Sequence, residues 1–312
     1  MAAVEELAAT QGGLVTREQL SALGVDRAVV ARRIAAGRWS GPAGTVVGTT
    51  SGALTVRARR WLGVLTVPGA SALAGRTALE MHGLRRWEVS TVTAMVAAPQ
   101  HPVRLPEQDV EFVRSRRPFA TWCVELDGLP VLRAAVAAVL LAERLPTERA
   151  AGGVLAACVQ QRITTAETLA AWVDRLRPLR RAEPMRAVLA DIGGGAHSMA
   201  EVDLVRLCRD HGLADPTLQV QRRDRDGRVR WTDAEWRLPS GRIVVLEIDG
   251  AFHRDVESWV DDLARQRALT TPDRVVLRCA ATELRETPDL VVGDLVAVGV
   301  PVVAPALRKT AR

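Results

Sequence analysis

The chain has 312 residues, of which 48% are hydrophobic and 25% charged, with a formal net charge of +6 and a pI near 10.2. This composition excludes a disordered chain and leaves room for two or three domains. No apolar run reaches membrane-spanning length, and the first residues are acidic where a signal peptide is basic, so we expect a cytoplasmic protein without a membrane partner.

The numbers and positions of cysteine, lysine and arginine residues limit the kinds of site that the chain can form. The 4 cysteines lie far apart without a CxxC pair, which argues against a zinc site and a disulfide framework. Lys309 is the only lysine, so no lysine serves catalysis inside a folded domain. Basic residues prevail in the first two thirds of the chain, which suits an anionic partner such as DNA, although arginines on a solvated surface explain the excess equally well. The last third of the chain is rich in acidic residues, whose carboxylates could bind a metal ion.

Residues 1–50 predict three short helices followed by a β-hairpin. Thr16, with glutamine three residues later, begins the second helix, and Asp26 caps the third, which ends at Gly37. The stretch WSGPAGTVVGT then fits a hairpin. This order of elements is that of a winged helix-turn-helix domain.

The third helix of such a domain enters the DNA major groove. In this sequence it would present Arg27, Arg32 and Arg33 to bases or phosphates, and Arg38 on the wing would meet the DNA backbone. The alternative is a plain three-helix module that contacts other proteins.

Residues 51–190 predict a mixed region of helices and short strands. Helices are expected at 52–65, 69–84 and 129–145, and strands are expected within 90–99 and 110–115. The region shows no group of residues that indicates a chemical site. We therefore expect it to be structural or to face DNA.

Residues 191–312 predict a further domain. A helix after Ser198 is followed by three strands, a helix within 255–269, the strand RVVLRC and a last helix after Thr287. The expected order is α-β-β-β-α-β-α, and the expected fold class of the whole chain is α/β of the α+β kind.

Carboxylates interrupt the apolar strand VVLEIDG in this domain. A three-residue hairpin loop at 239–241 would place Asp233 directly opposite Glu247, about 5 Å apart at Cβ, with Asp249 on the same face. A two-residue loop would turn Asp233 away. Three carboxylates so close repel one another unless a cation or a proton intervenes, and Mg²⁺ or Mn²⁺ is the natural partner for oxygen ligands.

The stretches HSMAE, WTDAEW, VVLEIDGAFH, DDLARQRAL and RVVLRC carry a resemblance over about 190–300. Together they resemble the PD-(D/E)XK nuclease superfamily, and more narrowly the domains related to the very-short-patch repair endonuclease. Residues 1–90, with GGLVTREQL and GRW followed by GTVVG, resemble the winged-helix N-terminal domain of AbiEi-type antitoxins.

The nuclease resemblance implies a role for each residue of the motif. Asp233 and Glu247 would be metal ligands with the carbonyl of Ile248 as a third, and Glu201 would be an accessory ligand. The superfamily usually carries lysine where this chain has Asp249, so His253 would act as the general base. The metal would lower the pKa of the attacking water.

Each of these residues also has a structural interpretation. Ser198 and Glu201 form a capping box, and Asp233 can pair with Arg230 or Arg242. Asp249 can end its strand in a turn, and a single histidine such as His253 is usually structural.

Two functions from different classes follow. One is a DNA-binding protein with a metal-dependent endonuclease domain. The other is an antitoxin-like transcriptional repressor, with a toxin protein as partner, whose nuclease fold is catalytically silent. A third interpretation is a partner-binding module that never contacts DNA.

Overall fold

The computed structural model describes residues 1–303 except 68, 70, 88, 103, 195–197, 225–226 and 250–268. It confirms a mixed α and β protein, with helices and three separate sheets among these residues. The chain forms two compact units, Met1–Arg180 and Arg181–Arg312. The boundary predicted at 190/191 falls inside helix α9 (Ala182–Gly193), which groups with the second unit. The stretches predicted as separate domains, 1–50 and 51–190, lie together in the first unit up to residue 180.

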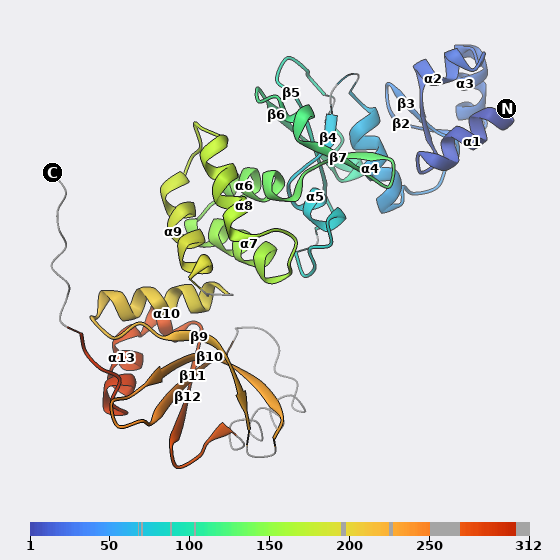
Figure 1. Ribbon diagram of the computed structural model, residues 1–312. Coiled ribbons are helices and arrows are strands. Elements are labelled where there is room, and N and C mark those ends of the chain that lie inside the picture. The colour runs from blue at the N-terminus through green and yellow to red at the C-terminus, as the bar shows by residue number, and fades with distance from the viewer. Residues whose placement is uncertain are drawn as a thin grey trace. The chain divides into compact units, whose positions relative to one another are not determined.

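The first fifty residues form a small helical module with a sheet of its own (Figure 1). Its elements in chain order are α1 (Ala2–Thr10), β1 (Leu14–Thr16), α2 (Arg17–Ala22), α3 (Arg27–Ala35), β2 (Ser40–Ala43) and β3 (Val46–Gly48). The predicted starts are confirmed, because the Thr16 side chain accepts from the Gln19 N–H in a capping box and Asp26 accepts from the Val29 N–H. The predicted hairpin is confirmed by the antiparallel pairing of β2 with β3.

A strand that the sequence analysis did not predict completes this module. β1 follows α1 directly and pairs with β3 to give the order β1-β3-β2. Its three residues are too few to show a periodicity, and their partner strand lies far along the chain. Val15 of β1 and Val47 of β3 are directly opposite each other in the buried core of the module.

The middle region is built on a five-stranded sheet in the order β6-β5-β4-β8-β7. Its strands are β4 (Ser71–Leu73), β5 (Val92–Ala97), β6 (Val110–Ser115), β7 (Cys123–Leu126) and β8 (Leu129–Leu132). Its helices are α4 (Val56–Leu65), α5 (Gly75–Met81), α6 (Ala134–Arg144), α7 (Glu148–Gln160) and α8 (Ala166–Arg175).

Two stretches of this region were predicted wrongly as continuous helix. The stretch 69–84 contains β4 before α5, and 129–145 opens with β8 before α6. Both strands are short and apolar and run into an apolar helix, so the local pattern cannot separate them. Their pairing with strands elsewhere in the chain, such as β5 beside β4, decides the structure.

The second unit carries a four-stranded sheet in the order β12-β11-β10-β9. After α9 come α10 (Met199–Asp210), β9 (Thr217–Arg223), β10 (Val229–Arg237), β11 (Ile243–Asp249), β12 (Arg274–Ala280), α12 (Glu283–Glu286) and α13 (Pro288–Ala297). Strands β9, β10 and β11 form an antiparallel meander, and β12 runs parallel to β11. The helix predicted within 255–269 falls largely outside the described residues.

One face of this sheet packs against helices. The core joins residues of α10, the sheet, α12 and α13, among them Leu204, Cys208, Trp236, Leu246, Leu284 and Leu295. Full burial of one leucine side chain contributes about 1.5–3 kcal/mol, so this face fixes how α10 and α13 lie on the strands. The opposite face of β11 and β12 carries Val245 and Val276, which pack with Leu269.

Within the described residues, every helix is too short or too polar to cross a lipid bilayer.

Candidate functional site

The hairpin between β10 and β11 has the register that the predicted site needs. Ala234 lies opposite Leu246, and Arg237 lies opposite Ile243. The Leu238 N–H donates to the Arg242 carbonyl over 2.8 Å, and Gly241 has a φ of +84°. The predicted loop 239–241, with a left-handed glycine, is therefore confirmed. Continued by one pair, the same register places Asp233 opposite Glu247.

Asp233 uses a carboxylate oxygen inside the sheet. Its Oδ2 accepts a hydrogen bond of 2.8 Å from the backbone N–H of Ile248, the residue whose carbonyl is the third predicted ligand. The side chain thus closes the end of the ladder between β10 and β11. Arg230, one of the two arginines proposed as a partner for Asp233, pairs with Asp224 at 3.1 Å.

Glu247 lies at intermediate depth on β11, and its Oε1 atom is buried. It is opposite Arg278 of the parallel strand β12. A carboxylate oxygen in a buried position requires compensation by a hydrogen bond, a positive group or a proton. Glu247 therefore places a carboxylate oxygen in the interior of the sheet, next to the strand position of Arg278.

Asp249 forms an ion pair with Arg278 at 2.5 Å, and the side chains of both residues are about one fifth exposed, at 22% and 20%. Its backbone carbonyl also accepts from the Ala281 N–H over 2.9 Å. The arginine neutralises the position where the nuclease superfamily carries its lysine. Among the described residues, no group of three or more His, Cys, Asp or Glu side chains is arranged to hold a metal ion. The expected three-carboxylate cluster is therefore not assembled within the described part of the chain.

Ser198 caps helix α10, which is one half of the predicted capping box, and Glu201 is its partner in this cap. Its backbone N–H donates to the Ser198 hydroxyl over 3.2 Å, and its Oε1 accepts from Ser198 over 3.1 Å and from Gln219 over 3.0 Å. The residue is only 4% exposed. Gln219 reaches it from a left-handed backbone conformation with φ +51°, and the ladder between β9 and β10 skips the pair that would contain Gln219.

The predicted general base, His253, lies outside the described residues. Of the stretch VVLEIDGAFH, the structure describes residues 244–249, which include Glu247 and Asp249.

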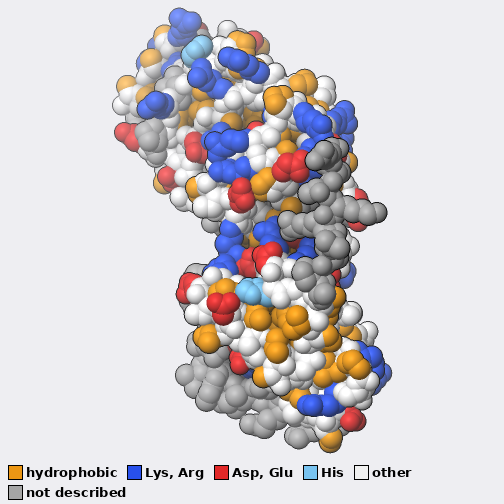
Figure 2. All heavy atoms as spheres, turned by 90° about the vertical axis from the view of Figure 1, so that its left-hand side faces the viewer, with side chains coloured by type: hydrophobic (Ala, Val, Ile, Leu, Met, Phe, Trp, Pro, Cys, Tyr) orange, Lys and Arg blue, Asp and Glu red, His pale blue; other side chains and the backbone are white. Residues whose placement is uncertain are grey.

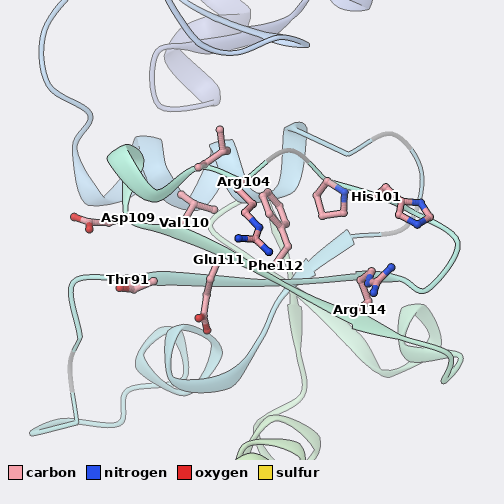
Figure 3. Close-up of a pocket in the computed structure, with 10 residues that line it drawn as sticks. Thr91, His101, Arg104, Asp109, Val110, Glu111, Phe112 and Arg114 are labelled. Carbon is pink, nitrogen blue, oxygen red and sulfur yellow. The ribbon is translucent and has the colours of Figure 1, made fainter.

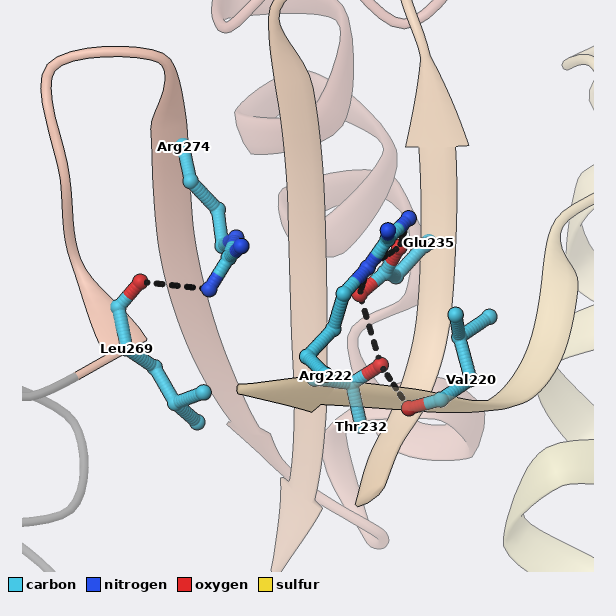
Figure 4. A network of polar contacts seen from close by, with 6 residues as sticks. All are labelled: Val220, Arg222, Thr232, Glu235, Leu269 and Arg274. Atoms are coloured by element: carbon cyan, nitrogen blue, oxygen red, sulfur yellow. Dashed lines mark hydrogen bonds and ion pairs between the residues drawn. The ribbon is translucent and has the colours of Figure 1, made fainter. Parts of the chain in front are cut away.

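A buried ion pair on the same sheet was missed by the sequence analysis (Figure 4). Glu235 is 4% exposed, and the Arg222 guanidinium donates to both of its oxygens at 2.6–3.1 Å. The Thr232 hydroxyl lies 2.8 Å from Oε1 of Glu235 and 3.2 Å from the Val220 carbonyl. An acidic residue inside the otherwise buried end of β10, with arginines on the preceding strand, was the available signal.

The pKa of the Cys279 thiol depends on the charges at this end of the sheet. Burial, and then the carboxylates of Glu283, Asp249 and Asp233, raise the pKa of the Cys279 thiol from 9.0 to about 12. Asp233 and Asp249 thus lie close enough to Cys279 for their charges to disfavour its thiolate. The hydrogen bond with Glu235 raises the pKa of Arg222 for the opposite reason, because it favours the charged form of the guanidinium.

The predicted DNA-facing arginines divide into two kinds. Arg27 and Arg32 on α3, and Arg38 before β2, are exposed. Arg33 is half-buried with its guanidinium carbon 4.9 Å from the centre of the Trp39 ring, so it supports the core of the module. Figure 2 shows that Lys and Arg side chains occur at several places on one face of the molecule, so charge alone does not single out a site.

Comparisons with known proteins identify no family. No family model matches the sequence, and no curated protein matches it significantly. A crystal structure of the RV2827C protein from Mycobacterium tuberculosis is similar over 62% of this chain and 76% of that chain, with 19% identity and a TM-score of 0.41. A likeness this weak carries no inference about function.

Proposed function

We propose that this is a DNA-binding protein whose first fifty residues act as a winged helix-turn-helix module, with α3 as the recognition helix and the β2–β3 hairpin as the wing. The observation that carries the proposal is the exposure of Arg27, Arg32 and Arg38 around a helix that Asp26 caps. Exposed arginines on such a helix can reach phosphates and base edges without breaking contacts inside the protein.

The fixed positions of the neighbouring elements support this assignment. Arg17 donates from its side chain to the Gly44 carbonyl over 2.8 Å, which ties α2 to the turn of the hairpin. Arg33 rests on Trp39, which joins α3 to the start of β2. The helix and the hairpin are thereby held together as one rigid surface, as recognition of a DNA groove requires.

Salt-dependent DNA binding tests the proposal. The double variant Arg27→Glu/Arg32→Glu should weaken the binding of duplex DNA by about a hundredfold and flatten the dependence of affinity on salt, because phosphate contacts release counterions. Arg85→Glu is the matched control, since Arg85 is exposed in the same unit but outside the module. Salt-insensitive binding, or an equal loss in both variants, would exclude the module as the DNA-binding surface.

A second activity, metal-dependent cleavage of DNA, is favoured by the register of β10 and β11, which, continued by one pair beyond Ala234 and Leu246, sets Asp233 opposite Glu247. Mg²⁺ is often held by one or two carboxylates together with waters and substrate phosphates, so this pair fits Mg²⁺ or Mn²⁺. When bound, such an ion would supply positive charge for the developing charge on a phosphate. Asp249 would keep its contact with Arg278 and stay outside the ligand set.

Glu247→Gln separates the enzyme from the antitoxin-like repressor with a silent nuclease fold. An enzyme should nick supercoiled plasmid with Mg²⁺ or Mn²⁺ but not with EDTA, and the variant should lose this activity while Asp249→Asn retains it. Wild-type protein should also gain thermal stability from Mn²⁺ that Glu247→Gln does not gain. Absence of cleavage and of the thermal shift, with unchanged DNA binding, would favour the repressor, to which the missing lysine already points.

A further inference from the structure

A hollow of about 810 Å³ lies beside strand β6 in the middle region (Figure 3). Strand β6 is the outermost strand of its five-stranded sheet, so the hollow opens along a sheet edge. The volume lies within the range of small-molecule sites, about 300–1,000 Å³. Its lining combines a phenylalanine, two arginines and a histidine with a few smaller side chains.

The positive groups of this hollow are available to a ligand. Arg104, Arg114 and His101 are exposed and make no ion pair with any residue that the structure describes. The acidic groups beside them are already engaged: Asp109 lies 3.4 Å from Arg59, and Glu111 accepts a hydrogen bond of 2.8 Å from Thr93. Figure 3 also draws Glu111 pointing away from the two arginines. With Asp109 paired to Arg59, the two arginines of the lining outweigh the one remaining carboxylate, Glu111.

An aromatic ring lies among these charges. Val110, Phe112 and Arg114 alternate along β6 and so share one face of the strand. Phe112 is only half-buried, and Figure 3 shows it near Arg104, with Arg114 further along β6. A hollow lined by an aromatic ring and two arginines matches a ligand that joins a flat base to a phosphate, because bases stack on aromatic side chains and arginine binds phosphate oxygens in pairs.

We propose that this hollow binds a nucleotide, with its base on Phe112 and its phosphate between Arg104 and Arg114. This site goes beyond the DNA-binding module and does not depend on it, since none of its residues belongs to residues 1–50. The same chemistry is offered by a free nucleotide and by a single strand of nucleic acid. Arginines that serve only solubility have no reason to line the same hollow as a half-exposed aromatic ring.

Titration calorimetry on the full chain with EDTA tests the proposal. The probes are deoxyadenosine monophosphate, inorganic phosphate and a single-stranded oligodeoxyadenylate. Arg104→Gln/Arg114→Gln should weaken binding of all three probes by about tenfold or more. Phe112→Leu keeps the apolar volume but removes the ring, so it should weaken the nucleotide and leave inorganic phosphate unchanged.

Two controls make the outcome decisive. Arg85→Gln removes an exposed arginine outside the hollow, and Arg27→Glu/Arg32→Glu disables the proposed DNA-binding module; both should bind the mononucleotide as wild type does. Tighter binding of the oligonucleotide would identify a strand as the ligand, and equal or tighter binding of the mononucleotide would identify a free nucleotide. The absence of saturable binding, an equal loss in Arg85→Gln, or full nucleotide affinity in Phe112→Leu would overturn the proposal.

Discussion

Charged residues are used in opposite ways in the N-terminal module and in the sheet of the second unit. On α3 and before β2, Arg27, Arg32 and Arg38 are exposed. On the second sheet the charged side chains contact one another, as Glu235 does with Arg222 and Asp249 with Arg278.

This difference shows why residue type alone does not define a site. An exposed arginine gains a phosphate contact without losing another contact. A carboxylate that already accepts a backbone N–H through one oxygen, as Asp233 does, keeps its other oxygen for a further ligand. The arginines of the N-terminal module are thus exposed to solvent, whereas the carboxylates at the end of β11 already take part in contacts inside the sheet.

The largest effect is expected where a charge is buried. Arg222→Ala should lower the free energy of unfolding by about 3 kcal/mol, because it leaves Glu235 buried without its guanidinium partner. Chemical denaturation measures this loss. Arg223→Ala is the control on the same strand, since Arg223 is exposed and donates to the Gly227 carbonyl. Equal stabilities of the two variants would show that the pair does not stabilise the sheet.

Two substitutions of Asp233 distinguish a structural role of this carboxylate from a metal-binding role. Asp233→Ala should cost about 1–2 kcal/mol, because the Ile248 N–H loses its acceptor. Asp233→Asn keeps an acceptor oxygen and should cost clearly less while removing the charge needed for a divalent cation. Denaturation curves with and without Mn²⁺ distinguish the two losses. A larger cost for Asp233→Asn than for Asp233→Ala would contradict the hydrogen-bond role.

The cap of α3 predicts a smaller effect in the N-terminal module. Asp26→Ala should lower stability by about 1 kcal/mol, since the Val29 N–H loses the Asp26 oxygen. Asp26→Ser retains a capping oxygen and should recover most of this loss in thermal unfolding. An unchanged Asp26→Ala melting temperature would mean that the cap does not hold the helix that presents Arg27 and Arg32.

The smallest effect concerns the buried thiols and is expected only at alkaline pH. Burial raises the pKa of Cys158, Cys208 and Cys279 from 9.0 to about 12 in each case. The folded chain keeps these protons where the unfolded chain loses them, so their contribution to stability is complete below pH 9 and is lost as the pH rises toward 12. Urea denaturation of Cys279→Ala should show a weaker loss of stability in alkali than wild type. An identical pH dependence would place the ionisation elsewhere.

Much of the local structure was readable in the sequence. Thr16, Asp26 and Ser198 begin helices as predicted, because their side chains accept hydrogen bonds from N–H groups only three residues away. The register of β10 and β11 is the one that a three-residue loop with a left-handed Gly241 predicts, and the structure excludes the alternative of a two-residue loop. These features depend on neighbours in the chain.

Other features depend on distant residues and were decided by the tertiary structure. Strands β1 and β8 are short segments that become strands because β3, β4 and β7 pair with them. The sequence placed Asp233, Glu247 and Asp249 near one another but did not show that Ile248 and Arg278 would contact two of them. The sequence by itself thus determined the caps, the turn and the direction of side chains on each strand, since these follow from local backbone geometry. Only the packed sheet decided which charges are neutralised, because that depends on which arginine and which N–H the fold brings within reach.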